Sequence, residues 1–187
     1  MSKRDDGEFF RKVSDDLELQ TVLRRCGVEL WRPSVHEQPH NAVLKFWNPR
    51  WLIEMPDGKG VEGVNVHYEA RVRNELRVEA EIEPYIPSLA KLPIREAELK
   101  RQLAVKADLL AILRRRLLSH EFASELGATE RLQRPTDRTS TQCAVKFANH
   151  LPVSPDPADA AAYFARIIEK TSPIIDEIVR SIALPQD

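Results

Sequence analysis

The sequence predicts a two-layer α+β protein in which long helices pack on one face of an antiparallel sheet. Three observations lead to this class. From Val64 to Ile82, apolar and polar residues alternate with a period of two, which is typical of a half-buried β-hairpin. Residues 94–125 and 157–182 instead repeat apolar residues at helical spacing. Turn residues separate these patterns, and the predicted order is α-ββββ-α-ββ-α.

The chain is expected to divide into an N-terminal helix with an irregular arm, residues 1–41, and an α+β domain, residues 42–187. The helix covers residues 6–26 and ends at Gly27, a common stop signal. Its imperfect apolar stripe consists of Phe9, Phe10, Val13, Leu17 and Leu23. Residues 31–41 are polar and contain two prolines, so they are predicted to form a loop or an irregular edge.

Four strands are expected between residues 42 and 85. Two short ones, 42–47 and 51–55, are separated by Asn48 and Pro49. The hairpin follows, and its loop must contain an odd number of residues if Val72 and Leu76 share a face. The simplest loop is 73–75. The outward face of the second hairpin strand, with Glu79, Glu81 and Glu83, is predicted to be solvated.

The second helix, residues 94–125, is apolar on two sides and should end near Gly127. Its main stripe runs along the leucines from Leu99 to Leu118 and includes Lys106 and Arg114, which should lie at its edge unless a carboxylate holds Arg114 inside. A narrower stripe contains Leu109 and Ile112. Because only one side can face the sheet, the narrower stripe should face the last helix or another subunit, and a homodimer is predicted.

A second strand pair, residues 129–133 and 142–149, should follow. The last helix then begins with Asp156 as N-cap and Pro157 in the first turn. Its apolar residues stay in phase on both sides of Pro173, which predicts one kinked helix rather than two.

Composition limits the function classes. With 42% hydrophobic and 30% charged residues and a net charge of -1, the chain reads as globular and is not drawn as a whole to nucleic acid or membranes. Residues 91–146 nevertheless carry 12 basic and 7 acidic residues. Cys26 and Cys143 are too few for a disulfide framework. Without a recognisable signal peptide or membrane span, a cytoplasmic location is expected.

Residues 51–182 resemble an uncharacterised bacterial domain family found at the C-terminus of nuclease-like or restriction-associated proteins. The resemblance rests on the hairpin VHYEARVRNELRVEAEIEPY, the helix end LLSHEFASELG, the segment QCAVKFANHL and the Asp-Pro helix start. It implies a setting in bacterial defence or phage counter-defence and carries over no catalytic residue. The order of elements is also similar to that of type III secretion chaperones.

Two groups of residues could bind a metal ion. His36 and His40 are four residues apart beside Glu37, but Pro39 between them disfavours the helix that a zinc site would need. Glu79 and Glu81 with His67 could instead serve a metal-dependent hydrolase. Arg71 and Arg77 lie near these glutamates and would neutralise part of their charge, which favours an ordinary sheet surface.

Basic residues suggest a second alternative. Arg131, Arg134 and Arg138 could contact phosphates in a nucleic-acid-associated accessory protein. That region lacks aromatic residues that would stack on bases.

Trp31, Trp47 and Trp51 gather in a proline-broken region, where they could form core or anchor a partner. No ordered catalytic constellation or phosphate-binding loop is recognisable in the sequence. The sequence therefore predicts a non-enzymatic protein-binding or assembly module without a cofactor. Its candidate partner-binding residues are Trp31, Trp47, Trp51, Leu109 and Ile112. The alternatives are the nucleic-acid-associated protein, a secretion-chaperone-like protein and the metal-dependent hydrolase.

Overall fold

The computed structural model describes residues 6–36, 43–54, 63–73, 77–85, 96–130, 144–147, 151–152 and 155–183. Its elements, in chain order, are α1 (Asp6–Ser14), α2 (Leu17–Cys26), β1 (Glu29–His36), β2 (Val43–Glu54), β3 (Gly63–Arg73), β4 (Arg77–Tyr85), α3 (Glu96–Leu118), α4 (Phe122–Glu125), β5 (Ala128–Thr129), β6 (Val145–Phe147) and α5 (Pro157–Ala183).

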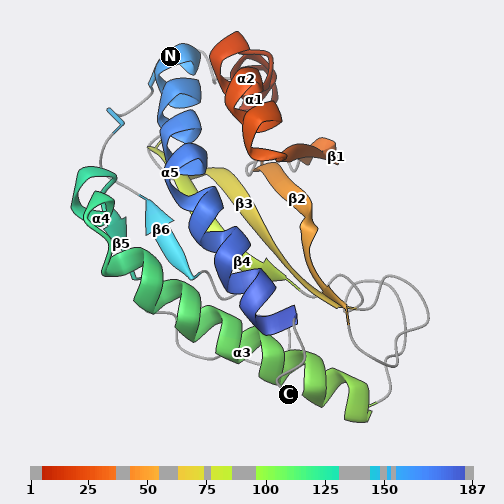
Figure 1. The fold of residues 1–187 in the computed structure, drawn as a ribbon. Helices are drawn as coiled ribbons and strands as arrows, with labels where there is room; N and C mark the ends of the chain where they lie inside the picture. The colour runs from red at the N-terminus through yellow and green to blue at the C-terminus, as the bar shows by residue number, and fades with distance from the viewer. Residues whose placement is uncertain are drawn as a thin grey trace.

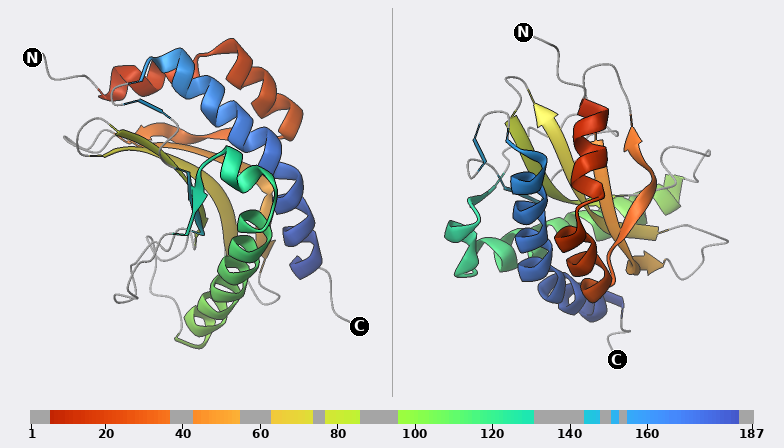
Figure 2. Two further views of the ribbon diagram at one scale, coloured as in Figure 1. Left: turned by 90° about the vertical axis from the view of Figure 1, so that its left-hand side faces the viewer. Right: turned by 90° about the horizontal axis from the view of Figure 1, so that it is seen from above.

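The strands form one six-stranded antiparallel sheet in the order β1-β2-β3-β4-β6-β5 (Figure 1). Figure 2 shows α1, α2 and α5 on one side of this curved sheet. Helix α3 contacts α5 and the strands β3, β4 and β6. The predicted α+β class, with helices packed on an antiparallel sheet, is confirmed. Among the described helices, none combines the length and apolar character needed to cross a bilayer.

The first strands differ from the prediction. The two strands expected at 42–47 and 51–55 are one strand, β2, whose register against β3 shifts between Trp47 and Leu52. Asn48 and Pro49 therefore mark a β-bulge and not a break. The segment expected to be a loop or irregular edge contains the edge strand β1, which has its own register shift between Leu30 and Val35. The rest of that segment, 37–41, lies outside the described residues.

The hairpin of β3 and β4 forms as predicted, with a different register. Val72 pairs with Val78, and Arg73 pairs with Arg77. The connection is therefore residues 74–76, one residue later than predicted, and Val72 does not pair with Leu76. Parity is preserved, because registers that differ by two residues place the same side chains on the same face.

The single helix expected over residues 6–26 is two helices. Asp16 adopts an extended conformation with ψ 130°, which ends the helical path, and its carboxylate accepts a hydrogen bond from the Leu19 amide at 3.0 Å. Asp16 is thus the N-cap of α2. Gly27 ends α2 with φ 66°, as predicted. Both helices belong to the main core, to which they contribute Phe9, Phe10, Val13, Leu19, Val22 and Leu23.

The long helix expected over residues 94–125 ends at Leu118 as α3, and the short helix α4 follows before Gly127. Its buried side is also rotated from the predicted main stripe, since Leu103 is 38% exposed. The buried positions are Gln102, Lys106, Leu109, Leu110, Leu113 and Leu117. Leu109 is fully buried and Ile112 packs against the core, so both predicted stripes serve this one chain.

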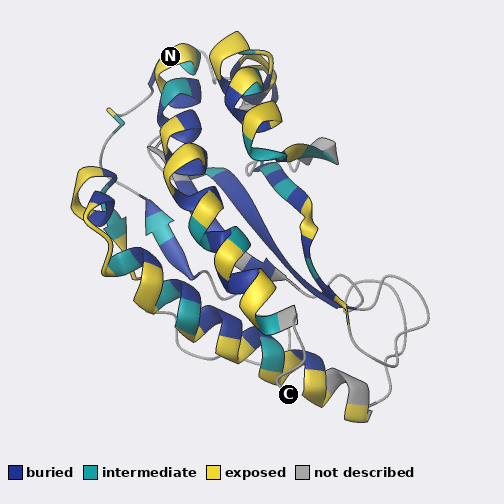
Figure 3. Cartoon of the chain, in the orientation of Figure 1, coloured by how far each residue is buried: buried dark blue, intermediate teal, exposed yellow. Residues whose placement is uncertain are grey.

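The C-terminal half follows the prediction more closely. Strands β5 and β6 pair with each other, with Ala128 opposite Phe147. The Asp156 carboxylate accepts a hydrogen bond from the Ala158 amide at 2.9 Å at the start of α5. As expected, α5 continues through Pro173 as one helix. Figure 3 shows its buried residues facing the sheet and its exposed residues facing away.

Candidate functional site

The second face of the sheet, opposite α5, carries polar and charged residues from four strands. Antiparallel pairing places Lys45, Glu69, Glu81 and Lys146 in one row across β2, β3, β4 and β6. Trp47 lies opposite His67 in the neighbouring row, and Val43 lies opposite Arg71 on the other side. We refer to the six residues Lys45, His67, Glu69, Arg71, Glu81 and Lys146 as the charged face.

The centre of the charged face is buried, which corrects the prediction of a solvated surface. Asn65, His67 and Glu69 are each 1% exposed, and Glu81 is 2% exposed. The register also places Glu79 and Glu83 on this side, but their side chains lie outside the described residues. Burial of ionisable side chains costs free energy unless they are paired, so their partners decide what this face can do.

Glu69 is the centre of an ion-pair cluster. Its Oε2 atom lies 2.7 Å from Lys45 Nζ and 3.5 Å from His67 Nε2, and its Oε1 atom pairs with Arg71 Nε. The Lys45 and Arg71 side chains are 22% and 25% exposed. The carboxylate is therefore enclosed, whereas its two permanent cations extend towards solvent.

The partners of Glu69 determine its protonation. Burial by itself would raise the pKa of this carboxyl group. The approach of His67 and the charges of Lys45 and Arg71 outweigh burial and leave the pKa of Glu69 below its ordinary value. Glu69 is consequently ionised at neutral pH, and such a stabilised carboxylate is a weak proton acceptor.

An aromatic pair adjoins this cluster at the β1 end of the sheet. The ring centroids of Trp31 and Trp47 are 4.9 Å apart, and Trp31 meets the His67 ring edge-on at 5.9 Å. Both indoles are half-buried. We call Trp31 and Trp47 the tryptophan pair. Such mutually packed rings present apolar area in a fixed orientation.

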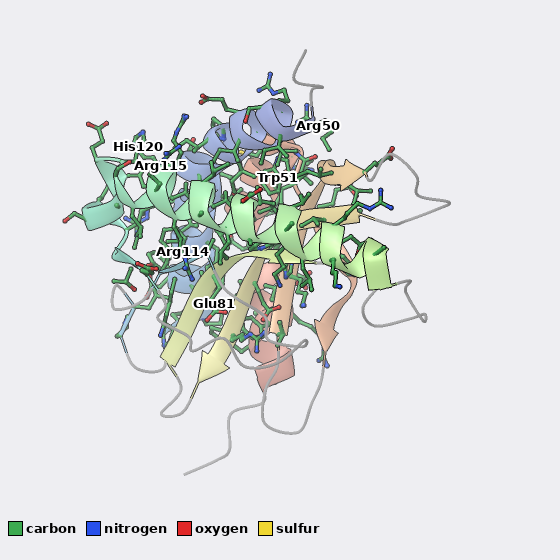
Figure 4. The ribbon with its side chains drawn as sticks, turned by 90° about the horizontal axis from the view of Figure 1, so that it is seen from below. Arg50, Trp51, Glu81, Arg114, Arg115 and His120 are labelled. Carbon is green, nitrogen blue, oxygen red and sulfur yellow. The ribbon has the colours of Figure 1, made fainter. Side chains whose placement is uncertain are left out.

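Trp51 does not join the tryptophan pair. It is fully buried on the other face, where its indole N–H donates to Asp176 Oδ1 at 2.6 Å and its ring meets Tyr68 edge-on. The bulge in β2 explains this. Between Trp47 and Leu52, β2 advances five residues while β3 advances two, from His67 to Asn65, and this odd difference of three residues reverses the alternation of sides. In Figure 4, Trp51 lies near α5, well apart from Glu81.

Of the five candidate partner-binding residues, two are therefore interior. Trp51 and Leu109 are both 0% exposed within the single chain, so a partner-binding role does not fit their positions. Ile112 is half-buried against the core. Trp31 and Trp47 keep partly exposed positions that a partner could reach.

The predicted nucleic-acid contacts cannot be placed, because Arg131, Arg134 and Arg138 lie outside the described residues. Two neighbouring arginines on α3 are paired with acids. Arg114 lies 3.1 Å from Glu130, and Arg116 lies 2.8 Å from Glu177. Arg114 also donates to the carbonyl of Ala144, the residue before β6, at 3.3 Å. A carboxylate therefore holds Arg114, as one of the two sequence alternatives proposed.

Neither predicted metal site is assembled within the described residues. His36 lies at the end of β1 and His40 is outside the described part of the chain. Across the described segments, no three His, Cys, Asp or Glu side chains gather as a metal site would need. His67 approaches Glu69, whose other neighbours are the cations Lys45 and Arg71, and cations disfavour a bound metal ion.

A second polar cluster lies between β3 and α5. The Tyr68 hydroxyl is 2.8 Å from Thr171 Oγ1 and 3.0 Å from Ser172 Oγ, and both hydroxyls also donate to carbonyls of α5. Burial raises the pKa of Tyr68, and it also raises the pKa of the Cys26 thiol. These groups are neutral at physiological pH, which suits a structural cluster.

Sequence reasoning missed Lys45 as a partner of Glu69 and treated Arg71 only as a neighbour of the glutamates. Lys45 alternates with the buried Leu44 and Phe46. This alternation indicates that Lys45 lies on the face of the sheet opposite the helix-covered core. Its partner depended on the β2–β3 register, which one sequence does not specify.

The comparisons with known proteins found no match for this chain among protein-family models, curated proteins or solved structures. The family resemblance drawn from the sequence therefore stays a prediction.

Proposed function

We propose that this chain is a non-enzymatic protein-binding module, and that the tryptophan pair forms the centre of its partner-binding surface. The observation that carries this proposal is the position of Trp31 and Trp47, packed together and partly exposed at the edge of the sheet. Trp is enriched among residues that dominate binding energy, because it buries a large area with few rotatable bonds.

The charged face supports the same function. Lys45 and Arg71 extend from the buried Glu69 towards solvent, and Lys45 lies in the row next to Trp47. Their positions are fixed by the carboxylate, so the ordering of these long side chains is complete before a partner binds. Aromatic anchors beside fixed charges suit a protein partner with an apolar centre and a polar rim. The low proton affinity of Glu69 favours a binding role over acid-base catalysis.

The proposal includes two further features. The chain acts as a homodimer in the cytoplasm, and its setting is bacterial defence or counter-defence, as the family resemblance implies. No bound cofactor is part of this function.

The test is affinity capture with the tagged chain, with and without nuclease, read by mass spectrometry. We expect one stoichiometric protein that survives nuclease and is lost with Trp31→Ala. Leu103→Ala, which changes an exposed leucine on α3, is the control and should retain the partner. Capture only with intact nucleic acid would favour the accessory-protein alternative, and stoichiometric metal in the purified chain would favour the hydrolase.

A further inference from the structure

We propose that the groove between α2 and α5 is the self-association surface of this protein and that its occupant is the same groove of a second copy. This inference rests on the homodimer proposed above and names its interface. Figure 2 shows α2 alongside α5; the two helices are far apart in the sequence but adjacent in space. The groove between them has a volume of about 580 Å³.

Leu17 on this groove is 81% exposed, against 38% for Leu103, the other exposed large apolar residue in the described part of the chain. The remaining apolar residues of α2 are turned inward, and Leu19, Val22 and Leu23 are buried. Leu17 therefore adds little to the core. One exposed leucine is ordinary on a protein surface, so its neighbours must identify the occupant.

Two unpaired charges of opposite sign flank the groove. Glu18 lies on the α2 side and Arg166 on the α5 side, and both are exposed. Neither forms an ion pair with another described residue, whereas Arg25 and Glu169 on the same groove pair with each other. The groove is thus neutral in total. Arg166 lies 6.0 Å from the centroid of the Tyr163 ring, but neither it nor Glu18 has an oppositely charged partner among the described residues.

This arrangement is self-complementary. In a twofold-symmetric dimer, the same patch meets itself, so a residue that contacts a second residue is contacted by that residue in return. A rotated second copy can bring its Arg166 to Glu18 and its Glu18 to Arg166, with Leu17 shielded between them. A strongly acidic or basic partner would leave one of these charges facing a like charge.

The experiment measures molar mass in solution by light scattering after size exclusion across a wide concentration range. We expect the native chain to dimerise and Leu17→Glu to raise the dimer dissociation constant at least about 30-fold, the effect of an interface hot spot. Leu103→Glu is the matched control and should leave the dimer unchanged. Circular dichroism and partner capture by each variant confirm that the fold and the tryptophan pair are intact.

Charge exchange identifies the twofold pairing. Glu18→Arg and Arg166→Glu should each weaken the dimer, because each places like charges together, and the double variant should recover most of the loss. A native chain that stays monomeric at every concentration would overturn the homodimer itself. A dimer that Leu17→Glu and both single charge variants leave intact would overturn only the groove as its interface.

Discussion

Glu69 is the residue on which the charged face depends, since it is the buried anion that Lys45, His67 and Arg71 approach. A buried carboxylate is tolerated only while its partners remain in place. Glu69 is therefore better understood as an organiser of the neighbouring cations than as a source of large net stability.

Replacing Glu69 by Gln keeps the size of the side chain and removes its charge. Lys45 and Arg71 each lose the charge of the buried carboxylate that they contact, so the free energy of unfolding should fall by about 1–3 kcal/mol. Urea denaturation measures this change. The control is Glu177→Gln in the exposed pair with Arg116, which should change stability by less than about 0.5 kcal/mol. Equal effects from the two substitutions would contradict the central position of Glu69.

The lowered pKa of Glu69 also predicts a pH dependence. In the unfolded chain, this carboxyl group titrates near its ordinary value of 4.5, and in the folded chain it titrates lower. Its contribution to stability is thus complete above that value and is lost as the pH falls further, because the unfolded state binds a proton first. The stability difference between the native chain and Glu69→Gln should shrink between neutral pH and about pH 3. A constant difference across this range would show that the pKa is not lowered.

At the scale of elements, the end of α2 depends on one backbone conformation. Gly27 has φ 66°, and a Cβ atom there would lie 3.1 Å from Arg50 Nη2 and 3.4 Å from Asn48 Nδ2. The Arg50 side chain can move, so backbone strain should dominate the cost. Gly27→Ala should lower the free energy of unfolding by about 1–2 kcal/mol in urea titrations. Thr21→Ala, on the exposed side of the same helix, should change the free energy of unfolding little. An equally small change for Gly27→Ala would contradict the predicted backbone strain.

Most elements could be predicted from local signals, and the errors have a common cause. The alternation in β3 and β4, the N-cap of α5 and the stop at Gly27 each depend on residues close in sequence. The bulge in β2 and the break at Asp16 also have signals in the local sequence. Each of these signals, however, is compatible with two different structures. Asn48-Pro49 marks a bulge as readily as a strand end, and an aspartate marks a cap as readily as an exposed helix position.

The candidate site was harder to predict than the fold. The charged residues of β3 were identifiable by alternation, but their burial requires knowledge of what packs against the second face. The grouping of three tryptophans failed because the bulge sends Trp51 to the opposite side from Trp47. Which of the two structures a signal such as Asn48-Pro49 adopts, and the register that results, depend on contacts between distant segments, and these are absent from a local pattern.

At the scale of the whole molecule, the position of α3 shows whether its apolar sides are buried within one chain or need a second chain to cover them. Two overlapping apolar stripes allowed either arrangement. In the structure, α3 packs against α5 and against the strands, and Leu109 joins the same core as Phe10, Trp51 and Ile175. The self-association surface that we propose must then lie elsewhere, and the groove of α2 and α5 fits that requirement.

Leu109→Ala tests this arrangement directly. If Leu109 is a core residue, the substitution should lower the free energy of unfolding by about 2–5 kcal/mol through lost burial and a cavity. Leu103→Ala on the exposed side of the same helix should cost less than about 1 kcal/mol. The loss at Leu109 should also be independent of protein concentration, because a core contact is made within one chain, whereas loss of an interface contact depends on concentration by mass action. Urea denaturation at several concentrations distinguishes the two cases. If Leu109→Ala kept native stability but weakened the dimer, the result would indicate that α3 lies in the dimer interface.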